Sequence, residues 1–188
     1  MIRVVVLAFT FLFACSFQVL ASAEKASYNL FSTQCVNPLT NGTDPDVSQF
    51  HEWSDQEVLR LSAQTGLRPE GFRFWTPNGT EDILVWSETD PVCQVLHFGF
   101  QSSSAEEIWA MFEADASFRT QPFVSSDVSS EGLAISGFAS KKTSGNRFVQ
   151  VTVMFRDYKQ PGATIVMLTA VNVGPSPASC DLFPEECE

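Results

Sequence analysis

Cysteine placement constrains the fold of this chain more than any other feature, because disulfides fix which segments lie side by side. Four of the five cysteines follow the N-terminal segment, and they are Cys35, Cys93, Cys180 and Cys187. In an oxidising compartment an even number of cysteines predicts disulfides, here two bonds with three possible pairings. Nearness in sequence favours Cys180 with Cys187, which leaves Cys35 with Cys93. By loop-entropy reasoning each bond is worth about 2–4 kcal/mol.

The start of the sequence indicates an oxidising destination. Arg3 is followed by the apolar run 4–20 and by Ala-Ser-Ala at 21–23, the pattern that a signal peptidase recognises. We therefore expect a signal peptide over residues 1–23, an exported protein of the periplasm or extracellular space, and no membrane span after cleavage. Two alternatives remain open: an uncleaved membrane anchor, and a lipoprotein at Cys15, since the preceding Leu-Phe-Ala loosely fits a lipobox.

Acidic residues outnumber basic ones, and the formal net charge is −11. The sequence contains no basic block or stripe, so we expect no binding to nucleic acid. A strongly negative charge favours solubility, and it also attracts basic proteins or cationic small molecules.

Two hydrophobic periodicities predict the fold class. Helical spacing or capping signals mark residues 24–35, 54–66 and 103–112, whereas a period of two marks strands at 72–75, 83–86, 92–100, 132–139, 147–155 and 164–173. We expect a single α+β domain over residues 24–175. It should contain an antiparallel sheet of five to six strands, with the N-terminal helices and one mid-chain helix packed on one face. Residues 176–188 should form a C-terminal tail pinned by a disulfide.

The order of these elements resembles cone-shaped folds in which a pocket lies between helices and a curved sheet. The strand of Cys93, followed by a helix that starts with Glu106 and Glu107, resembles small periplasmic proteins of unknown function. This resemblance covers about a third of the chain and contains no catalytic motif, and a fold does not by itself give a function.

His51 and His97 are the two histidines of the chain. No nucleophile elbow, zinc-protease motif, dinucleotide fingerprint or phosphate loop is present in the sequence. His97 shares a strand face with Cys93 and Val95, so it is the candidate for a base or a ligand, although a strand histidine is more often a hydrogen-bonded packing residue. His51 lies among acidic residues and should be a solvated surface group.

Metal and cofactor sites are not expected. Asn41, Asp44 and Asp46 offer oxygen ligands, but the twelve-residue calcium loop is absent and a capped turn is the simpler interpretation. The spacing of the C-terminal cysteines suits neither a zinc site nor a redox pair. Asn41 and Asn78 begin glycosylation sequons, which matter only if the host glycosylates proteins.

Trp75 and Trp86 lie on the two arms of a predicted hairpin. Tryptophan suits apolar or sugar ligands, so these two residues are the candidates for ligand binding. The alternative is that the hairpin simply packs them onto the core.

The sequence favours an exported, non-enzymatic binding or interaction protein, for example an inhibitor or immunity protein that blocks a basic partner. A hydrolase that uses His97 is the alternative. A cavity that joins His97 to a carboxylate or a serine would favour the enzyme, whereas an exposed acidic or aromatic patch far from His97 would favour the interaction protein.

Overall fold

The computed structural model of the chain describes residues 23–65, 69–121, 124–128, 132–143, 147–157 and 164–187, without the side chains of 64–65, 124–128 and 132–136. Apart from Ala23, the expected signal peptide lies outside the described residues.

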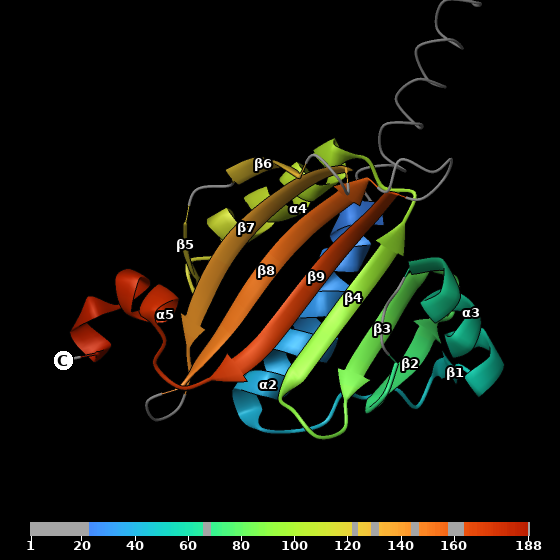
Figure 1. Ribbon diagram of the computed structural model, residues 1–188. Coiled ribbons are helices and arrows are strands. Elements are labelled where there is room, and N and C mark those ends of the chain that lie inside the picture. Colours follow the sequence, from blue (N-terminus) through green and yellow to red (C-terminus); the bar gives the residue numbers. More distant parts are fainter. Residues whose placement is uncertain are drawn as a thin grey trace, which may run out of the picture.

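One antiparallel sheet forms the frame of the molecule (Figure 1). The strands are β1 (Phe50–Glu52), β2 (Phe72–Pro77), β3 (Asp82–Ser87), β4 (Val92–Phe98), β5 (Arg119–Thr120), β6 (Val124–Val128), β7 (Gly132–Lys142), β8 (Phe148–Asp157) and β9 (Thr164–Val173). Eight of them follow the order β1-β2-β3-β4-β9-β8-β7-β5, and β6 pairs with β7 beside β5. The expectation of five to six strands was therefore too low. The missed strands β1 and β5 are only three and two residues long, too short to show alternation, and β6 is mostly polar.

Two three-stranded meanders meet at the centre of the sheet, and β1, β5 and β6 extend it at its edges. Strands β2, β3 and β4 form one meander, and β7, β8 and β9 form the other. The last strand of each meander pairs with the last strand of the other, from Val92 opposite Val171 to Phe98 opposite Ile165. Strand β8 shows the expected alternation, since Val149, Val151 and Val153 are fully buried and the residues between them are not.

The chain before the sheet is helical from residue 23 to residue 41, and we call this segment the N-terminal helix. It continues as a π-helix, η1 (Ser32–Val36), and as α2 (Asn37–Asn41). Pro38 lies at the start of α2, directly after the π-helix, and the helix continues through it. The helix ends at Gly42, whose φ of 66° is left-handed. Among the described residues, no helix combines the length and the apolar character needed to cross a membrane.

The N-terminal helix and α4 (Ser102–Ala114) cover one face of the sheet, which lies behind the strands in Figure 1. Phe31 and Cys35 from the first helix, and Ile108 and Phe112 from the second, are all fully buried there. They pack with the sheet residues Val95, Val151, Leu168 and Ala170 in one hydrophobic cluster. We call this side of the sheet the inner face.

The helix α3 (Asp55–Thr65) lies on the other face, so the expectation that all helices share one face was wrong. Leu61 of α3 packs with Phe74, Ile83 and Leu96 in a second cluster. The reason can be read in β3, where Ile83, Leu84 and Val85 are all buried although they point to alternate sides. A sheet that is apolar on both sides needs cover on both sides.

Both expected disulfides are present. Cys35 of η1 is bonded to Cys93 of β4, with their Cα atoms 5.3 Å apart, and both residues are fully buried. Cys180 is bonded to Cys187 in the tail, with 5.6 Å between the Cα atoms. The first bond thus ties the N-terminal helix to the inner face of the sheet.

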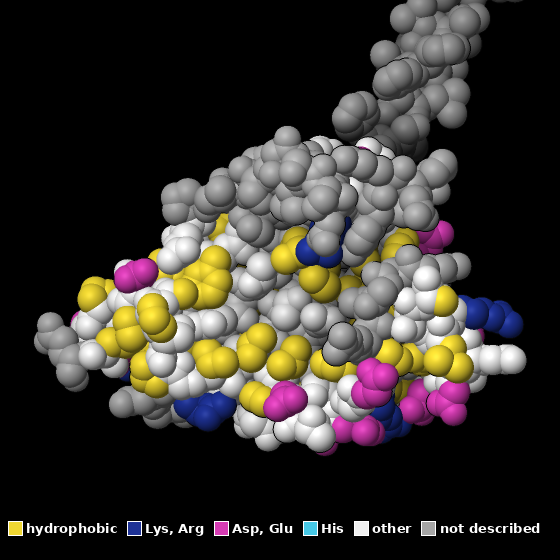
Figure 2. Space-filling view, viewed as in Figure 1, with side chains coloured by type: hydrophobic (Ala, Val, Ile, Leu, Met, Phe, Trp, Pro, Cys, Tyr) yellow, Lys and Arg dark blue, Asp and Glu magenta, His cyan; other side chains and the backbone are white. Residues whose placement is uncertain are grey.

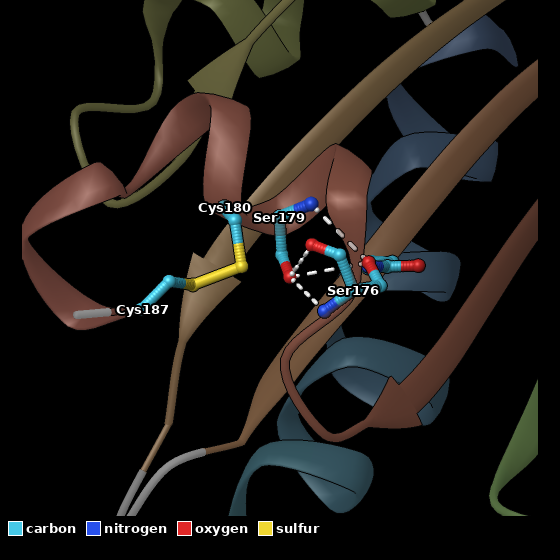
Figure 3. Close-up of a disulfide and its surroundings, with 5 residues drawn as sticks. Ser176, Ser179, Cys180 and Cys187 are labelled. Atoms are coloured by element: carbon cyan, nitrogen blue, oxygen red, sulfur yellow. Dashed lines mark hydrogen bonds between the residues drawn. A yellow bond between two sulfur atoms is a disulfide. The ribbon is translucent and has the colours of Figure 1, made fainter.

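The C-terminal tail consists of α5 (Pro177–Leu182) and the 3₁₀ turn η2 (Pro184–Glu186), and the Cys180–Cys187 bond joins them (Figure 3). A capping box starts α5: Ser179 N–H donates to Ser176 Oγ, and Ser176 N–H donates to Ser179 Oγ. The tail also packs on the domain, because Phe183 is 7% exposed and its ring lies 5.5 Å from that of Phe148.

Candidate functional site

Trp75 and Trp86 both point to the inner face of the sheet. Trp75 belongs to the cluster under the N-terminal helix, and Trp86 packs against that cluster while remaining partly exposed. They line one pocket of about 300 Å³, which we call the tryptophan pocket. Its lining residues are Asp44, Pro45, Val47, Arg73, Trp75, Trp86 and Glu88. The two predicted candidates are therefore brought together, with charged groups beside them.

Arg73 lines the same pocket beside the Trp75 ring. It is the cross-strand partner of Trp86, and its guanidinium carbon lies 4.9 Å from the centre of the Trp75 ring, within range of a cation–π contact. Its Nε donates to Glu52 Oε1 at 3.1 Å, and the hydrogen bonds with Glu52 raise the pKa of Arg73 above its usual value. Glu88 is more distant, with its Oε1 3.9 Å from the same nitrogen.

The outer wall of the tryptophan pocket is the segment 43–49, which follows the N-terminal helix. Thr43 N–H donates to the Pro38 carbonyl at 3.0 Å, and Asn78 Nδ2 donates to the Gln49 carbonyl at 2.9 Å. Val47 packs against the inner cluster between these two anchors. The wall is thus held at both ends and in its middle, so the pocket exists before any ligand arrives.

Among the described residues, no group of three or more His, Cys, Asp or Glu side chains could hold an ion. Asp46 instead accepts bonds from the side chain and the backbone of Ser48, which lower the pKa of Asp46. Asp44 lies on the rim of the tryptophan pocket.

His97 belongs to a second site, near the opposite end of β3. Its ring lies on the inner face, and its Nδ1 is 2.7 Å from Asp82 Oδ1, on the residue directly opposite in the β3–β4 pair. Ser27 of the N-terminal helix donates its hydroxyl to the same oxygen at 2.7 Å. The ring of Phe100 stacks on the imidazole with 3.5 Å between ring centres. The His97 side chain is 13% exposed and that of Asp82 only 3%.

A pocket of about 360 Å³ adjoins this histidine, and its lining includes Ala23, Ala26, Thr80, Asp82 and His97. The imidazole uses Nδ1 for Asp82, so Nε2 is the nitrogen left for a ligand or a proton. Ser27 bonds to the carboxylate and not to the imidazole, so the pair that a serine hydrolase needs, a nucleophile bonded to its base, is not formed.

Sequence reasoning missed the partners of His97 because they depend on strand register. Asp82 lies opposite His97 only because the turn between β3 and β4 sets that pairing. Glu24 was also missed: it is 4% exposed, and Ser104 at the start of α4 donates to its Oε1 at 2.8 Å. Its Oε2 has no hydrogen-bond partner among the described residues.

His51 lies on the surface, as the sequence indicated. Its side chain is 62% exposed, and its Nε2 lies 3.5 Å from Glu57 at the start of α3.

Comparison of the chain with protein-family models, with curated proteins and with solved structures found no match. The two sites differ in their chemistry. The tryptophan pocket combines an aromatic wall with charged groups, whereas the His97 site joins an imidazole to a carboxylate, with no nucleophile bonded to the imidazole among the described residues.

Proposed function

We propose that this chain is an exported binding protein that holds a small ligand, or a side chain of a partner, in the tryptophan pocket. One observation carries the proposal: two tryptophans from neighbouring strands line a single pocket together with Asp44, Arg73 and Glu88. Binding sites typically join apolar aromatic walls to a few polar groups that fix the orientation of the ligand.

The construction of the pocket supports this role. Trp75 is 3% exposed and serves as a fixed floor, while Trp86 is partly exposed and offers its ring to a ligand. Rigid aromatic groups provide contact area at a low cost in side-chain entropy. The anchored wall 43–49 lowers that cost further, because little has to be ordered on binding.

Export is supported by the two disulfides, which persist in oxidising compartments. An inhibitor or immunity protein is one form that such a binding protein can take. We expect the exported protein to begin at Glu24, and its intact mass after secretion would measure this. A lipid on Cys15, or a full-length chain recovered with membranes, would contradict it.

The indole N–H signals of the four tryptophans provide a direct test. Each signal would be assigned by single substitution, and a library of small ligands would then be screened by NMR. We expect hits to shift the Trp86 and Trp75 signals. The Trp109 signal serves as an internal control, because its N–H group donates to Glu113 on α4 and Trp109 does not line the pocket.

A Trp86→Leu variant completes the test. It should remove the shifts without unfolding the protein, since Trp86 is not part of the fully buried core. A library in which no compound shifts Trp86, or shifts that persist in the variant, would contradict the proposal.

Hydrolysis at the His97 site is the second candidate function. It is favoured by the 2.7 Å contact between His97 and Asp82 beside a pocket, which is the arrangement of a general base oriented by a carboxylate. Because Ser27 is bonded to Asp82, the nucleophile in this candidate is a water molecule activated at Nε2 of His97. A hydrolase screen tests it, and a turnover that His97→Ala abolishes without lowering stability would replace the first proposal.

A further inference from the structure

The charges around the tryptophan pocket do not cancel. Its rim carries Asp44, Glu88 and Arg73, and Glu52 lies behind Arg73 within hydrogen-bond distance. Three carboxylates thus face one guanidinium. Asp44 makes no hydrogen bond or ion pair within the described part of the chain, and Glu88 approaches Arg73 only to 3.9 Å. The local potential is therefore negative, and it adds to the net charge of −11 on the whole chain.

The same end of the sheet is acidic over a wider area. Figure 2, which views the face of the sheet opposite the tryptophan pocket, shows Asp and Glu side chains gathered at the lower right with Lys or Arg side chains among them, near the ends of the strands where β3 leads into β4. Glu88 and Asp90 are exposed in that turn. A field of one sign over a cleft raises the local concentration of oppositely charged ligands.

The aromatic wall already holds one cation. The guanidinium of Arg73 lies over the Trp75 ring, while its partner Glu52 balances its charge. The neighbouring ring of Trp86 is partly exposed and has no cation in contact among the described residues. Trp86 is therefore a second aromatic surface in a negative field, and tryptophan is the best of the aromatic side chains for cation–π contacts.

We infer that the tryptophan pocket binds an organic cation, a guanidinium or an ammonium group, that stacks on Trp86 and pairs with Asp44 and Glu88. This inference rests on the proposed function, and it names the ligand class for the same pocket. A volume of about 300 Å³ suits a small molecule or the end of one basic side chain. Anions are disfavoured by the carboxylates of Asp44 and Glu88, and neutral compounds lack the charge that the rim recognises.

Three small probes that each carry an ethyl group separate the classes: ethylguanidinium, ethylurea and propionate. Binding is followed through the Trp86 indole signal in the intact protein. We expect ethylguanidinium to shift this signal in a saturable way, ethylurea to bind at least about tenfold more weakly, and propionate not to bind. An arginine-containing peptide is the fourth probe in this binding experiment. Tighter binding of the peptide than of ethylguanidinium, at the same signal, indicates a protein side chain as the natural ligand.

Charge variants give the sharpest test, because removing an acidic residue and removing Arg73 should change the affinity for ethylguanidinium in opposite directions. Asp44→Asn and Glu88→Gln should each weaken ethylguanidinium binding by about three- to tenfold, and added salt should reduce these differences. Arg73→Gln should strengthen it, since it removes a like charge. The matched control is Glu107→Gln on α4, which removes the same charge from an exposed position outside the pocket and should change nothing.

The outcomes are distinct. If ethylurea binds as well as ethylguanidinium, or if Arg73→Gln weakens binding of the cation, the cation inference fails while the pocket remains a binding site. If none of the probes shifts Trp86, the inference also fails. If no compound of the wider ligand library shifts the Trp86 signal either, the proposed function fails together with the cation inference.

Discussion

Nδ1 of His97 lies 2.7 Å from Oδ1 of Asp82, directly across the β3–β4 pair. The hydroxyl of Ser27 reaches the same oxygen, so a single carboxylate links two strands to the N-terminal helix. Asp82 is 2% exposed, and a carboxylate so buried depends on its partners because it has lost its hydration.

The first prediction concerns this link. Substituting His97→Ala should lower the free energy of unfolding by about 1–3 kcal/mol, because it leaves the buried Asp82 with one partner fewer. Urea unfolding of His97→Ala, Asp82→Asn and the double variant would show the interaction as a coupling of about 1 kcal/mol or more. His51→Ala is the control, since the exposed imidazole of His51 should contribute little. Additive effects of the two substitutions would contradict the prediction.

The second prediction concerns pH and Asp115, at the end of α4. Burial alone would raise the pKa of this carboxyl, but hydrogen bonds from Ser117 and the charge of Lys141 outweigh it and hold the pKa below its usual range. The charged form is thus favoured in the fold. The contribution of Asp115 to the free energy of unfolding is complete at pH values above the usual carboxyl pKa, and it is lost as the pH falls through the lowered pKa.

Asp115→Asn should therefore destabilise the protein at pH 7 and have little effect at strongly acidic pH. We expect a difference of a few tenths to about 1 kcal/mol, because water partly screens this carboxylate. Urea unfolding at pH 7 and near pH 2 would measure it. Glu106→Gln, at an exposed position of the same helix, is the control for loss of charge alone. A deficit that persists unchanged in acid would show that the carboxylate is not its source.

The third prediction compares the disulfides. The Cys35–Cys93 bond closes a separation of 58 residues, and the Cys180–Cys187 bond closes one of 7. Replacing the first pair by alanine should cost about 4 kcal/mol and replacing the second about 2–3 kcal/mol, because longer loops gain more entropy when released. Thermal melts of the two double variants would rank them. Equal losses would indicate that strain or residual structure, rather than loop length, sets the contributions.

The fourth prediction concerns the tail. Phe183 packs on Phe148, and the guanidinium of Arg119 lies 4.3 Å from the centre of the Phe183 ring. Phe183→Ala should release α5 and η2 from the sheet while leaving the Cys180–Cys187 bond intact. Limited proteolysis should then cut the tail near the capping box before the domain is degraded. Pro184→Ala, at an exposed position next to Phe183, should leave the tail protected.

The sequence was informative where a pattern is local. The alternation in β8, the helical segment before Cys35 and the number of disulfides all follow from residues close together in the chain. The joining of Trp75 and Trp86 was also accessible, because a hairpin places its two arms side by side.

Other features depend on contacts that no local pattern encodes. The position of α3 on the outer face follows from the double-sided burial of β3, which became visible only once the strands were paired. The register that sets Asp82 opposite His97 cannot be read from either strand alone. The same holds for the charged rim of the tryptophan pocket, where Asp44 comes from a loop and Glu88 from beyond the end of a strand.

The pairing of β4 with β9 affects the order in which this chain can fold during synthesis. The central partners, Val95 and Leu168, lie 73 positions apart in the chain. A strand whose neighbour has not yet been synthesised offers an open edge to any other extended chain. During synthesis of the chain, the completed first meander leaves β4 unpaired until the last strand is made, and such long-range pairing is slow. Both cysteines of the Cys35–Cys93 bond lie in the first half of the chain. Oxidation before β9 is made would therefore tie the N-terminal helix to β4 while β4 is still unpaired.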